Sequence, residues 1–411
     1  MAQKSAIYLA YTAFFTCTKI VAVPIMVAVL SPSDYGKLSL ALTLFGTVTM
    51  ITFMSMRPPV VRQLAINTGR ENARYVSSAI ALIIGLTAIL AIAAALFENP
   101  ATHIFRLPLT LIEGLVLLGG AQSVYQVYLA VIQAKDQAKY YSALQSSFAL
   151  ANLAMTLAFL FILKFGWPSQ ALSYVICAVA GCAVAIAGIK RLRLFDVPRL
   201  EYAQELFGLG IAVVPAFLFI NTVDRMLLGA SFTPGDVGLY TLAQQIGAVV
   251  SFFASAVMLA LTPWAFREMS ECRSRADWAR VTRSLGLVAA VIIAVVAIFG
   301  IAVIAGASSF GSWRYVQMIT YFPWLLGGSG FLALYQVFAL PLYFRKRARL
   351  LGVSGALAAS TGLVMAVVLP RFFGPVGIAM AVCAGRFLQF AFVLVTGLHL
   401  GERGSGERRS E

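Results

Sequence analysis

Three basic side chains lie within otherwise apolar stretches, and they are the first residues of this sequence that suggest chemistry. Lys19, Arg225 and Arg386 each fall inside a run long enough to cross a bilayer. A charged side chain at the bilayer centre costs about 2.5–3.5 kcal/mol on insertion scales, so each needs a function or a partner. Cations in such a place can bind an anionic group, Arg through forked hydrogen bonds and Lys as a point charge.

Two polar residues accompany Arg225. Asn221 precedes Asp224 and Arg225 by three and four residues, which predicts that all three share one helix face. Asp224 would repel an anion, so we expect it to be an ion-pair partner or a proton site. A structural interpretation stays open beside the functional one: Asp224 could pair with Lys19 or Arg386, and Arg225 could extend to the membrane surface.

Glutamines within the apolar stretches are further candidates for substrate contact. They are Gln126, Gln244, Gln245 and Gln336. Their amides could bind the hydroxyls of a polar substrate, or they could hold helices together. The two histidines lack metal-ligand spacing, the five cysteines include no CxxC pair, and no phosphate-binding loop of the Walker type occurs. The sequence therefore predicts no catalytic residue, no metal and no cofactor.

The elements that must position these residues follow from composition. The chain of 411 residues is 60% hydrophobic and 11% charged, and its mean hydropathy is +0.87. Soluble domains are about half apolar and about a quarter charged. We therefore predict an all-α polytopic integral membrane protein with about twelve spans of roughly 20 residues. They are expected near 5–30, 37–56, 75–97, 110–132, 143–163, 169–189, 206–229, 237–262, 284–307, 317–340, 351–370 and 375–400.

The distribution of cations predicts the orientation of these spans. Of 31 Lys and Arg residues, 23 fall in alternate connections and the two ends, five fall in the connections of the opposite side, and three fall inside spans. The cation-rich side stays cytoplasmic. Both termini are therefore expected in the cytoplasm. The net charge of +15 needs no nucleic acid as a partner, because topology accounts for it.

The chain contains an internal repeat. Ser31–Ala41 and Thr233–Ala243 share Pro, Asp, Gly, Leu and Ala at equivalent positions. Pro58 and Arg62 match Pro263 and Arg267, and Tyr125-Gln-Val-Tyr128 matches Tyr335-Gln-Val-Phe338. The Pro-x-Asp-x-Gly pattern is also a good turn and helix start, but that does not explain its recurrence at the same connection of each half.

The repeat predicts a doubled six-helix unit. Because six spans return the chain to its starting side, the two halves should be parallel, as in transporters whose halves rock around a central site. We expect an N-terminal lobe at 1–190, a cytoplasmic linker at 191–205, a C-terminal lobe at 206–400 and a disordered cytoplasmic tail at 401–411.

Residues 221–243 resemble a known family. Asn221-Thr-Val-Asp-Arg225 followed by Gly235-Asp-Val-Gly238, together with Asp34-Tyr-Gly36 and Arg62, are similar to bacterial polysaccharide flippases. These O-antigen, capsule and exopolysaccharide flippases belong to the multidrug/oligosaccharidyl-lipid/polysaccharide exporter superfamily. The resemblance implies two six-helix lobes forming a V. Many polysaccharide members have fourteen spans, whereas this sequence predicts twelve, a number nearer to the drug-exporting branch.

The resemblance also implies a function. The expected activity is translocation of an undecaprenyl-diphosphate-linked oligosaccharide across the bacterial inner membrane, for cell-surface polysaccharide synthesis, with membrane lipid and polymerases or glycosyltransferases as partners. The three intramembrane cations would then neutralise the diphosphate. An ion-coupled exporter of drugs or organic cations is the alternative, but it predicts acidic residues in the first-lobe spans, where this chain has Lys19. A membrane polymerase or ligase would need a large periplasmic loop, which the sequence lacks, so no enzyme is expected.

Overall fold

The computed structural model describes residues 22–272, 274–309, 314–345 and 347–403, without the side chains of 212–221 and of some further helix positions. Every regular element in these ranges is a helix. Residues 22–29 are helical. The elements that follow, in chain order, are α2 (Pro32–Phe53), α3 (Arg57–Ile66), α4 (Arg70–Leu96), α5 (Glu98–Phe105), α6 (Leu109–Ala134), α7 (Ala138–Leu157), η1 (Ala158–Ile162), α8 (Pro168–Arg191), α9 (Leu200–Asn221), α10 (Val223–Ser231), α11 (Pro234–Glu271), α12 (Arg275–Ser309), η2 (Val316–Thr320), α13 (Phe322–Phe344), α14 (Ala348–Val368), α15 (Pro370–Phe373) and α16 (Val376–Arg403).

The described helices confirm a polytopic all-α membrane protein. Ten helical segments of the described chain are long and apolar enough to cross a membrane. Each of them overlaps one of the spans expected from sequence. The expected span at 5–30 lies mostly outside the described residues, as does Lys19. The remaining expected span, 206–229, was predicted to be continuous, but the structure divides it into two helices.

That interruption corrects the sequence analysis. α9 ends at Asn221 and α10 begins at Val223, with Thr222 between them at φ −134° and ψ −40°. The carboxylate of Asp224 accepts the backbone N–H of Arg225 at 2.8 Å, which is one of the first N–H groups of α10 that have no partner within the helix. The expectation of one continuous helix running through Asn221, Asp224 and Arg225 is therefore wrong.

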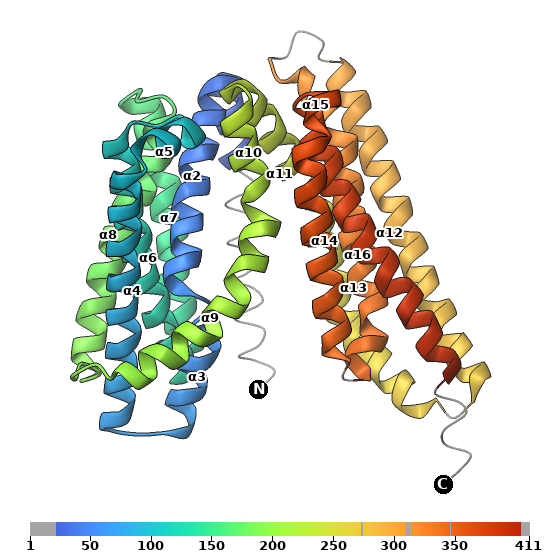
Figure 1. The fold of residues 1–411 in the computed structure, drawn as a ribbon, viewed down its shortest axis with the longest axis horizontal. Helices are drawn as coiled ribbons and strands as arrows, with labels where there is room; N and C mark the ends of the chain where they lie inside the picture. The colour runs from blue at the N-terminus through green and yellow to red at the C-terminus, as the bar shows by residue number, and fades with distance from the viewer. Residues whose placement is uncertain (1–21, 273, 310–313, 346, 404–411) are drawn as a thin grey trace. The chain divides into compact units, whose positions relative to one another are not determined.

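The chain divides into two compact units, residues 1–238 and 239–411, called here unit 1 and unit 2. In unit 1, α6 is central and packs against α2, α3, α4 and α8 (Figure 1). Its buried residues include Tyr125, Val127 and Leu129, which pack against Tyr75 and Val76 of α4 in one apolar core. In unit 2, α16 packs along both α13 and α14, and α12 packs on α13.

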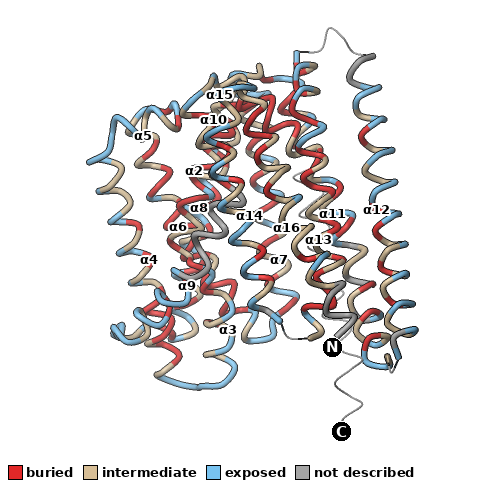
Figure 2. Tube along the Cα trace, turned by 45° about the vertical axis from the view of Figure 1, so that its right-hand side comes forward, coloured by how far each residue is buried: buried red, intermediate tan, exposed pale blue. Residues whose placement is uncertain are grey.

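Peripheral helices turn large apolar side chains outward. The outer face of α4 exposes Ile84, Ile89 and Ile92, and that of α12 exposes Leu287 and Ile298. Figure 2 shows exposed positions recurring along both helices. Contiguous apolar surface on this scale is unfavourable in water, whereas lipid is a suitable solvent for it. The burial pattern therefore agrees with a membrane environment for both units.

The two repeated turns begin α2 and α11 in the same way. The hydroxyl of Ser31 accepts the N–H of Asp34 at 3.1 Å, and the hydroxyl of Thr233 accepts the N–H of Asp236 at 3.3 Å. Each hydroxyl also donates to the carboxylate of the same Asp, at 2.8 and 2.6 Å. The hydroxyl residue is thus the N-cap, and the Asp reaches back to it from the first turn.

These two helix starts cross at a pair of glycines inside unit 1. A Cβ on Gly36 would overlap the carbonyl oxygen of Pro234, and one on Gly238 would overlap the carbonyl oxygen of Pro32. Each Cβ would also lie 3.0 Å from the backbone nitrogen of the other glycine. The contact is therefore reciprocal and backbone to backbone, as small residues permit in membrane helices. The glycines shared by the repeat are needed for this approach.

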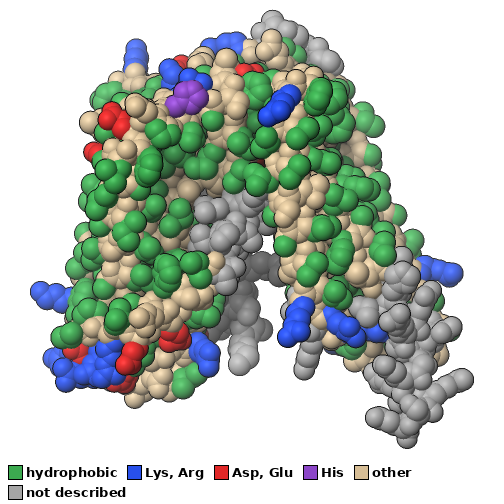
Figure 3. Space-filling view, in the orientation of Figure 1, with side chains coloured by type: hydrophobic (Ala, Val, Ile, Leu, Met, Phe, Trp, Pro, Cys, Tyr) green, Lys and Arg blue, Asp and Glu red, His purple; other side chains and the backbone are tan. Residues whose placement is uncertain are grey.

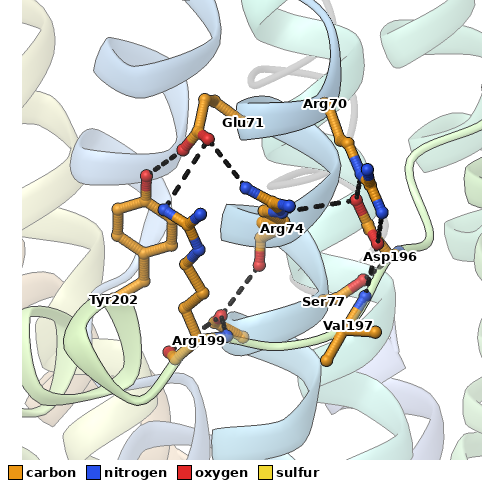
Figure 4. Close-up of polar contacts among 9 residues, drawn as sticks. Arg70, Glu71, Arg74, Ser77, Asp196, Val197, Arg199 and Tyr202 are labelled. Atoms are coloured by element: carbon orange, nitrogen blue, oxygen red, sulfur yellow. Dashed lines mark hydrogen bonds and ion pairs between the residues drawn. The ribbon is translucent and has the colours of Figure 1, made fainter.

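The connection between α8 and α9 is bound to the beginning of α4 by a polar network (Figure 4). Arg70 donates to the carboxylate of Asp196 at 2.6 Å, and Arg74 lies 3.4 Å from the same carboxylate. The hydrogen bond from Arg70, and then that from the N–H of Val197, lowers the pKa of Asp196 to about 2. A lowered pKa means that this attraction is present above the ordinary value near 3.8 and is lost only as the pH falls through about 2, so Asp196 is ionised at physiological pH.

Candidate functional site: a polar cavity in unit 1

Unit 1 contains a cavity of about 570 Å³ between α2, α6, α7 and α8. It is lined by Ala22, Phe45, Gly46, Thr49, Met50, Phe53, Arg57, Gln122, Gln126, Tyr141, Gln145, Phe148, Ala149, Asn152, Leu153, Thr156, Gln170 and Tyr174. This volume lies within the range of small-molecule sites, roughly 300–1,000 Å³. Such a concentration of amides and hydroxyls inside a membrane bundle marks it as the candidate functional site.

A sharp break after α2 brings Arg57 to this cavity. α2 ends at Phe53, and the next two residues, Met54 and Ser55, have φ of 47° and 53°, in the left-handed region. α3 then starts at Arg57 with prolines in its first turn, where the missing N–H of Pro costs nothing. The chain therefore turns at Met54–Ser55, and the first residue of the new helix faces the cavity rather than a solvent loop.

The guanidinium of Arg57 is held by neutral acceptors from two helices. It donates to Oε1 of Gln126 on α6 at 2.7 Å and to the hydroxyl of Tyr141 on α7 at 3.3 Å. Within the described residues, Arg57 has no ion-pair partner, and none of the residues lining the cavity is Asp or Glu. A cation that is balanced only by dipoles in a low-dielectric region attracts anions strongly. The electrostatic character of this cavity is therefore positive.

One face of α7 supplies much of the polar lining. Tyr141, Gln145, Asn152 and Thr156 recur at the spacing of one helix face. Asn152 donates to the hydroxyl of Ser173 on α8 at 3.2 Å, and Thr156 is hydrogen-bonded to the same hydroxyl at 2.6 Å. The deep end of this face is thus fixed by hydrogen bonds to α8. Immediately beyond Thr156 the helix changes to the π-helical turn η1, a feature frequent at functional sites.

Gln122 contributes a buried acceptor. Its side chain is 9% exposed, and its Oε1 has no hydrogen-bond partner in the described structure. Leaving a buried polar atom unpaired costs about 1–3 kcal/mol, so it calls for a donor in the cavity. Gln122 lies one turn before Gln126 on α6, and both therefore point to the same side. A hydroxyl-rich ligand would satisfy Gln122 while its anionic part faced Arg57.

A pocket in unit 2 is lined in part by residues that the sequence repeat relates to residues of the unit 1 cavity. This pocket of about 500 Å³ is lined by Met258, Thr262, Phe266, Tyr335, Gln336, Leu340 and Tyr343. By the sequence repeat, Met258, Thr262 and Gln336 correspond to Phe53, Arg57 and Gln126 of unit 1. The equivalent of the cation is therefore a neutral hydroxyl. Among the described lining residues of the two pockets, Arg57 of unit 1 is the one basic residue.

Comparison with known proteins assigns the chain to a family. A model of the family described as polysaccharide biosynthesis protein matches residues 2–269, which is well over half of the sequence. This chain belongs to that family. A Haemophilus influenzae protein, described as an uncharacterized membrane protein, is 25% identical over 164 residues, or 38% of this chain and 41% of that protein. The chain thus spans about two fifths of the length of this curated relative.

Solved membrane transporters share the fold of this chain. The lipid II flippase MurJ in an inward closed conformation superposes with a TM-score of 0.73 over 96% of this chain and 87% of that chain, at 11% identity. An inward-facing multidrug resistance MATE transporter of the MOP superfamily gives 0.70 over 94% of each chain, at 13% identity. The Vibrio cholerae MATE transporter VcmN gives 0.55, over 97% of this chain and 95% of that chain, at 12% identity. The family match confirms the resemblance drawn from sequence, and the structural matches show that the chain has the fold of these membrane transporters.

The residues that the sequence analysis proposed as substrate contacts lie in different parts of the structure. Gln126 lines the unit 1 cavity and Gln336 the unit 2 pocket. Gln244 and Gln245 are half-buried on α11, and Arg386 is half-buried on α16, where its Cδ packs near Gly328 of α13. Lys19 and the side chain of Asn221 lie outside the described residues. Their roles toward substrate stay predictions.

Asp224 and Arg225 pack inside unit 1. Asp224 is 6% exposed, and Arg225 donates to the hydroxyl of Thr43 on α2 at 3.4 Å. The neighbouring Thr222 lies 3.5 Å from the hydroxyl of Thr47, also on α2. These contacts fix the start of α10 to α2, and neither Asp224 nor Arg225 is among the residues lining the cavity.

Proposed function

We propose that this family member is a flippase that carries an undecaprenyl-diphosphate-linked oligosaccharide across the bacterial inner membrane by alternating access, for cell-surface polysaccharide synthesis. The observation that carries the proposal is the chemistry of the unit 1 cavity. Arg57 offers a forked donor suited to phosphate oxygens, and the surrounding amides and hydroxyls suit sugar hydroxyls. Membrane lipid and the enzymes that make or polymerise the oligosaccharide are the expected partners.

The alternative substrate class is an organic cation. A cation would meet the positive charge of Arg57, and no carboxylate among the described lining residues is there to neutralise it. Bringing two positive charges together in a region of low dielectric is unfavourable. The cavity therefore favours an anionic substrate, and transport rather than catalysis is the proposed activity.

A reconstituted system tests this proposal. Purified protein in liposomes is given an undecaprenyl-diphosphate-linked oligosaccharide with a fluorescent sugar, and an impermeant reductant reports the fraction of label in the outer leaflet. We expect protein-dependent exchange between leaflets, with little inhibition by an excess of ethidium. Exchange no faster than in empty liposomes, together with protein-dependent ethidium transport, would show that the alternative class is correct.

The proposed orientation places both termini and the cation-rich connections in the cytoplasm. Ser33, Ser231, Thr68 and Ser274 are all exposed in the structure, so single cysteines there, in a background without native cysteines, should be reactive if water reaches them. We expect Ser33→Cys and Ser231→Cys to react with an impermeant maleimide in intact spheroplasts. Thr68→Cys and Ser274→Cys should react only after permeabilisation. The reverse pattern at any two positions would contradict the orientation.

A further inference from the structure

A second pocket lies at the end of unit 1 where α3 and α4 meet. It has a volume of about 520 Å³ and is lined by Leu64, Asn67, Thr68, Gly69, Arg70, Asn72, Ala73, Lys135, Leu192, Arg193, Leu194, Phe195 and Asp196. Three connections converge there: α3 to α4, α6 to α7, and α8 to α9. Because α4 begins and α6 and α8 end at this pocket, it lies where three membrane spans reach the membrane surface.

The charge of the pocket is positive. Lys135 and Arg193 are exposed, and neither has an ion-pair partner within the described residues. The one carboxylate in the lining, Asp196, is already bound by Arg70 and Arg74 (Figure 4). Figure 3 shows Lys and Arg gathered over this end of unit 1. An anion in the pocket would therefore meet two free cations and a carboxylate that is already neutralised.

The buried side-chain oxygen of Asn72, in the lining of this pocket, needs a hydrogen-bond donor. Its side chain is 8% exposed, and Nδ2 donates to the carbonyl oxygen of Asn67 at 2.7 Å. Oδ1 has no hydrogen-bond partner in the described structure. An acceptor cannot bind a phosphate oxygen, but it can accept from a hydroxyl. The pocket thus combines cations for an anion with an acceptor for a hydroxyl.

Apolar side chains stand beside this polar chemistry. Ile66, Phe195, Val197 and Leu200 are 67%, 45%, 72% and 73% exposed, and they lie within or next to the segments that line the pocket. Exposed apolar groups beside a basic pocket at a membrane surface suit a ligand that has both acyl chains and an anionic headgroup. A soluble phosphate would not use them.

We propose that this pocket binds an anionic phospholipid whose headgroup carries hydroxyls, of the phosphatidylglycerol class. The phosphodiester lies between Lys135 and Arg193, and a headgroup hydroxyl donates to Oδ1 of Asn72. The acyl chains leave along the exposed apolar side chains. This site is separate from the unit 1 cavity and does not depend on the transported substrate.

Equilibrium binding to the full-length protein in a neutral detergent tests the proposal, using fluorescent short-chain lipids. Phosphatidylglycerol should bind at least about threefold more tightly than phosphatidylmethanol, which has the same charge but no hydroxyl, and far more tightly than phosphatidylcholine. The double variant Lys135→Gln/Arg193→Gln should weaken phosphatidylglycerol binding roughly tenfold or more, because each cation near an anionic lipid contributes to attraction. Its melting temperature without lipid should equal that of the wild type.

A charge-matched control is available in the same unit. Lys139 and Lys190 are exposed and do not line the pocket, so Lys139→Gln/Lys190→Gln should change the Kd less than twofold. An equal loss in both double variants would overturn the proposal, since net charge alone would then explain binding. Equal affinity for phosphatidylglycerol and phosphatidylmethanol would overturn the role of Asn72. Full competition by glycerol phosphate, or binding of the undecaprenyl-linked oligosaccharide alone, would overturn the assignment to phospholipid.

Discussion

Replacing Arg57 with Ala is expected to abolish export of the lipid-linked oligosaccharide while protein abundance stays near normal. The variant removes charge-assisted hydrogen bonds that contribute about 1.5–3 kcal/mol, which corresponds to roughly 10–100-fold in affinity. Gln126 and Tyr141 lose a donor, but both line a cavity that water can enter, so the folded state should tolerate the loss. Leaflet exchange in liposomes and surface polymer on cells measure the effect.

Two further variants separate charge from geometry. Arg57→Lys keeps the charge but loses the fork that reaches both Gln126 and Tyr141, so partial exchange should remain. Lys139→Ala on α7 removes an exposed cation that does not line the cavity, and exchange should be unchanged. If Arg57→Ala lowers abundance as much as exchange, or if Lys139→Ala is equally defective, then Arg57 is a structural residue and its substrate role must be abandoned.

The glycine crossing predicts the largest loss of stability. Gly36→Ala or Gly238→Ala should lower the melting temperature clearly, because the new Cβ overlaps a backbone carbonyl oxygen that cannot move without shifting a helix. Overpacking typically costs about 1–3 kcal/mol and sometimes more. Fluorescence-detected size exclusion after heating in detergent gives the melting temperature.

Gly85→Ala on α4 is the matched control. A Cβ there would meet nothing within 4 Å, so only helix propensity changes, and Ala is the better helix former by about 1 kcal/mol. Its melting temperature should therefore be equal or higher. Unchanged melting temperatures for both Gly36→Ala and Gly238→Ala would show that the two helix starts are less tightly packed than the structure indicates.

Span positions could be predicted well because lipid imposes a simple rule. A stretch of about 20 apolar residues must form a helix in the bilayer, and ten expected spans overlap the membrane-length helices of the described chain. The interruption at Thr222 could not be predicted in this way. It depends on local contacts, with Asp224 accepting the N–H of Arg225 and α10 packing on α2, and hydropathy averaged over a window does not detect such contacts.

The cavity was harder to predict than the fold. Arg57 follows the expected span 37–56, so the sequence placed it among the 23 cations of the connections. The turn that brings it to the cavity could not be predicted, because Met and Ser rarely adopt the left-handed conformation that Met54 and Ser55 have here. The polar face of α7 carried a detectable signal, since Tyr141, Gln145, Asn152 and Thr156 repeat at helical spacing. The sequence instead predicted Lys19, Arg225 and Arg386 as site residues, because they are the cations inside the predicted spans. Of all the predicted site residues, Gln126 is the one that lines the unit 1 cavity in the described structure.

The extent of unit 1 has a consequence for the order of synthesis. Its contacts include α10, which packs on α5 and α2, and the first turn of α11, whose Gly238 meets Gly36. Chains emerge N-terminus first at roughly 5–20 residues per second. Because about 200 residues separate Gly36 from Gly238, α2 remains without this contact for roughly 10–40 seconds during synthesis. During that interval the backbone at Gly36 is open to contact with other membrane helices.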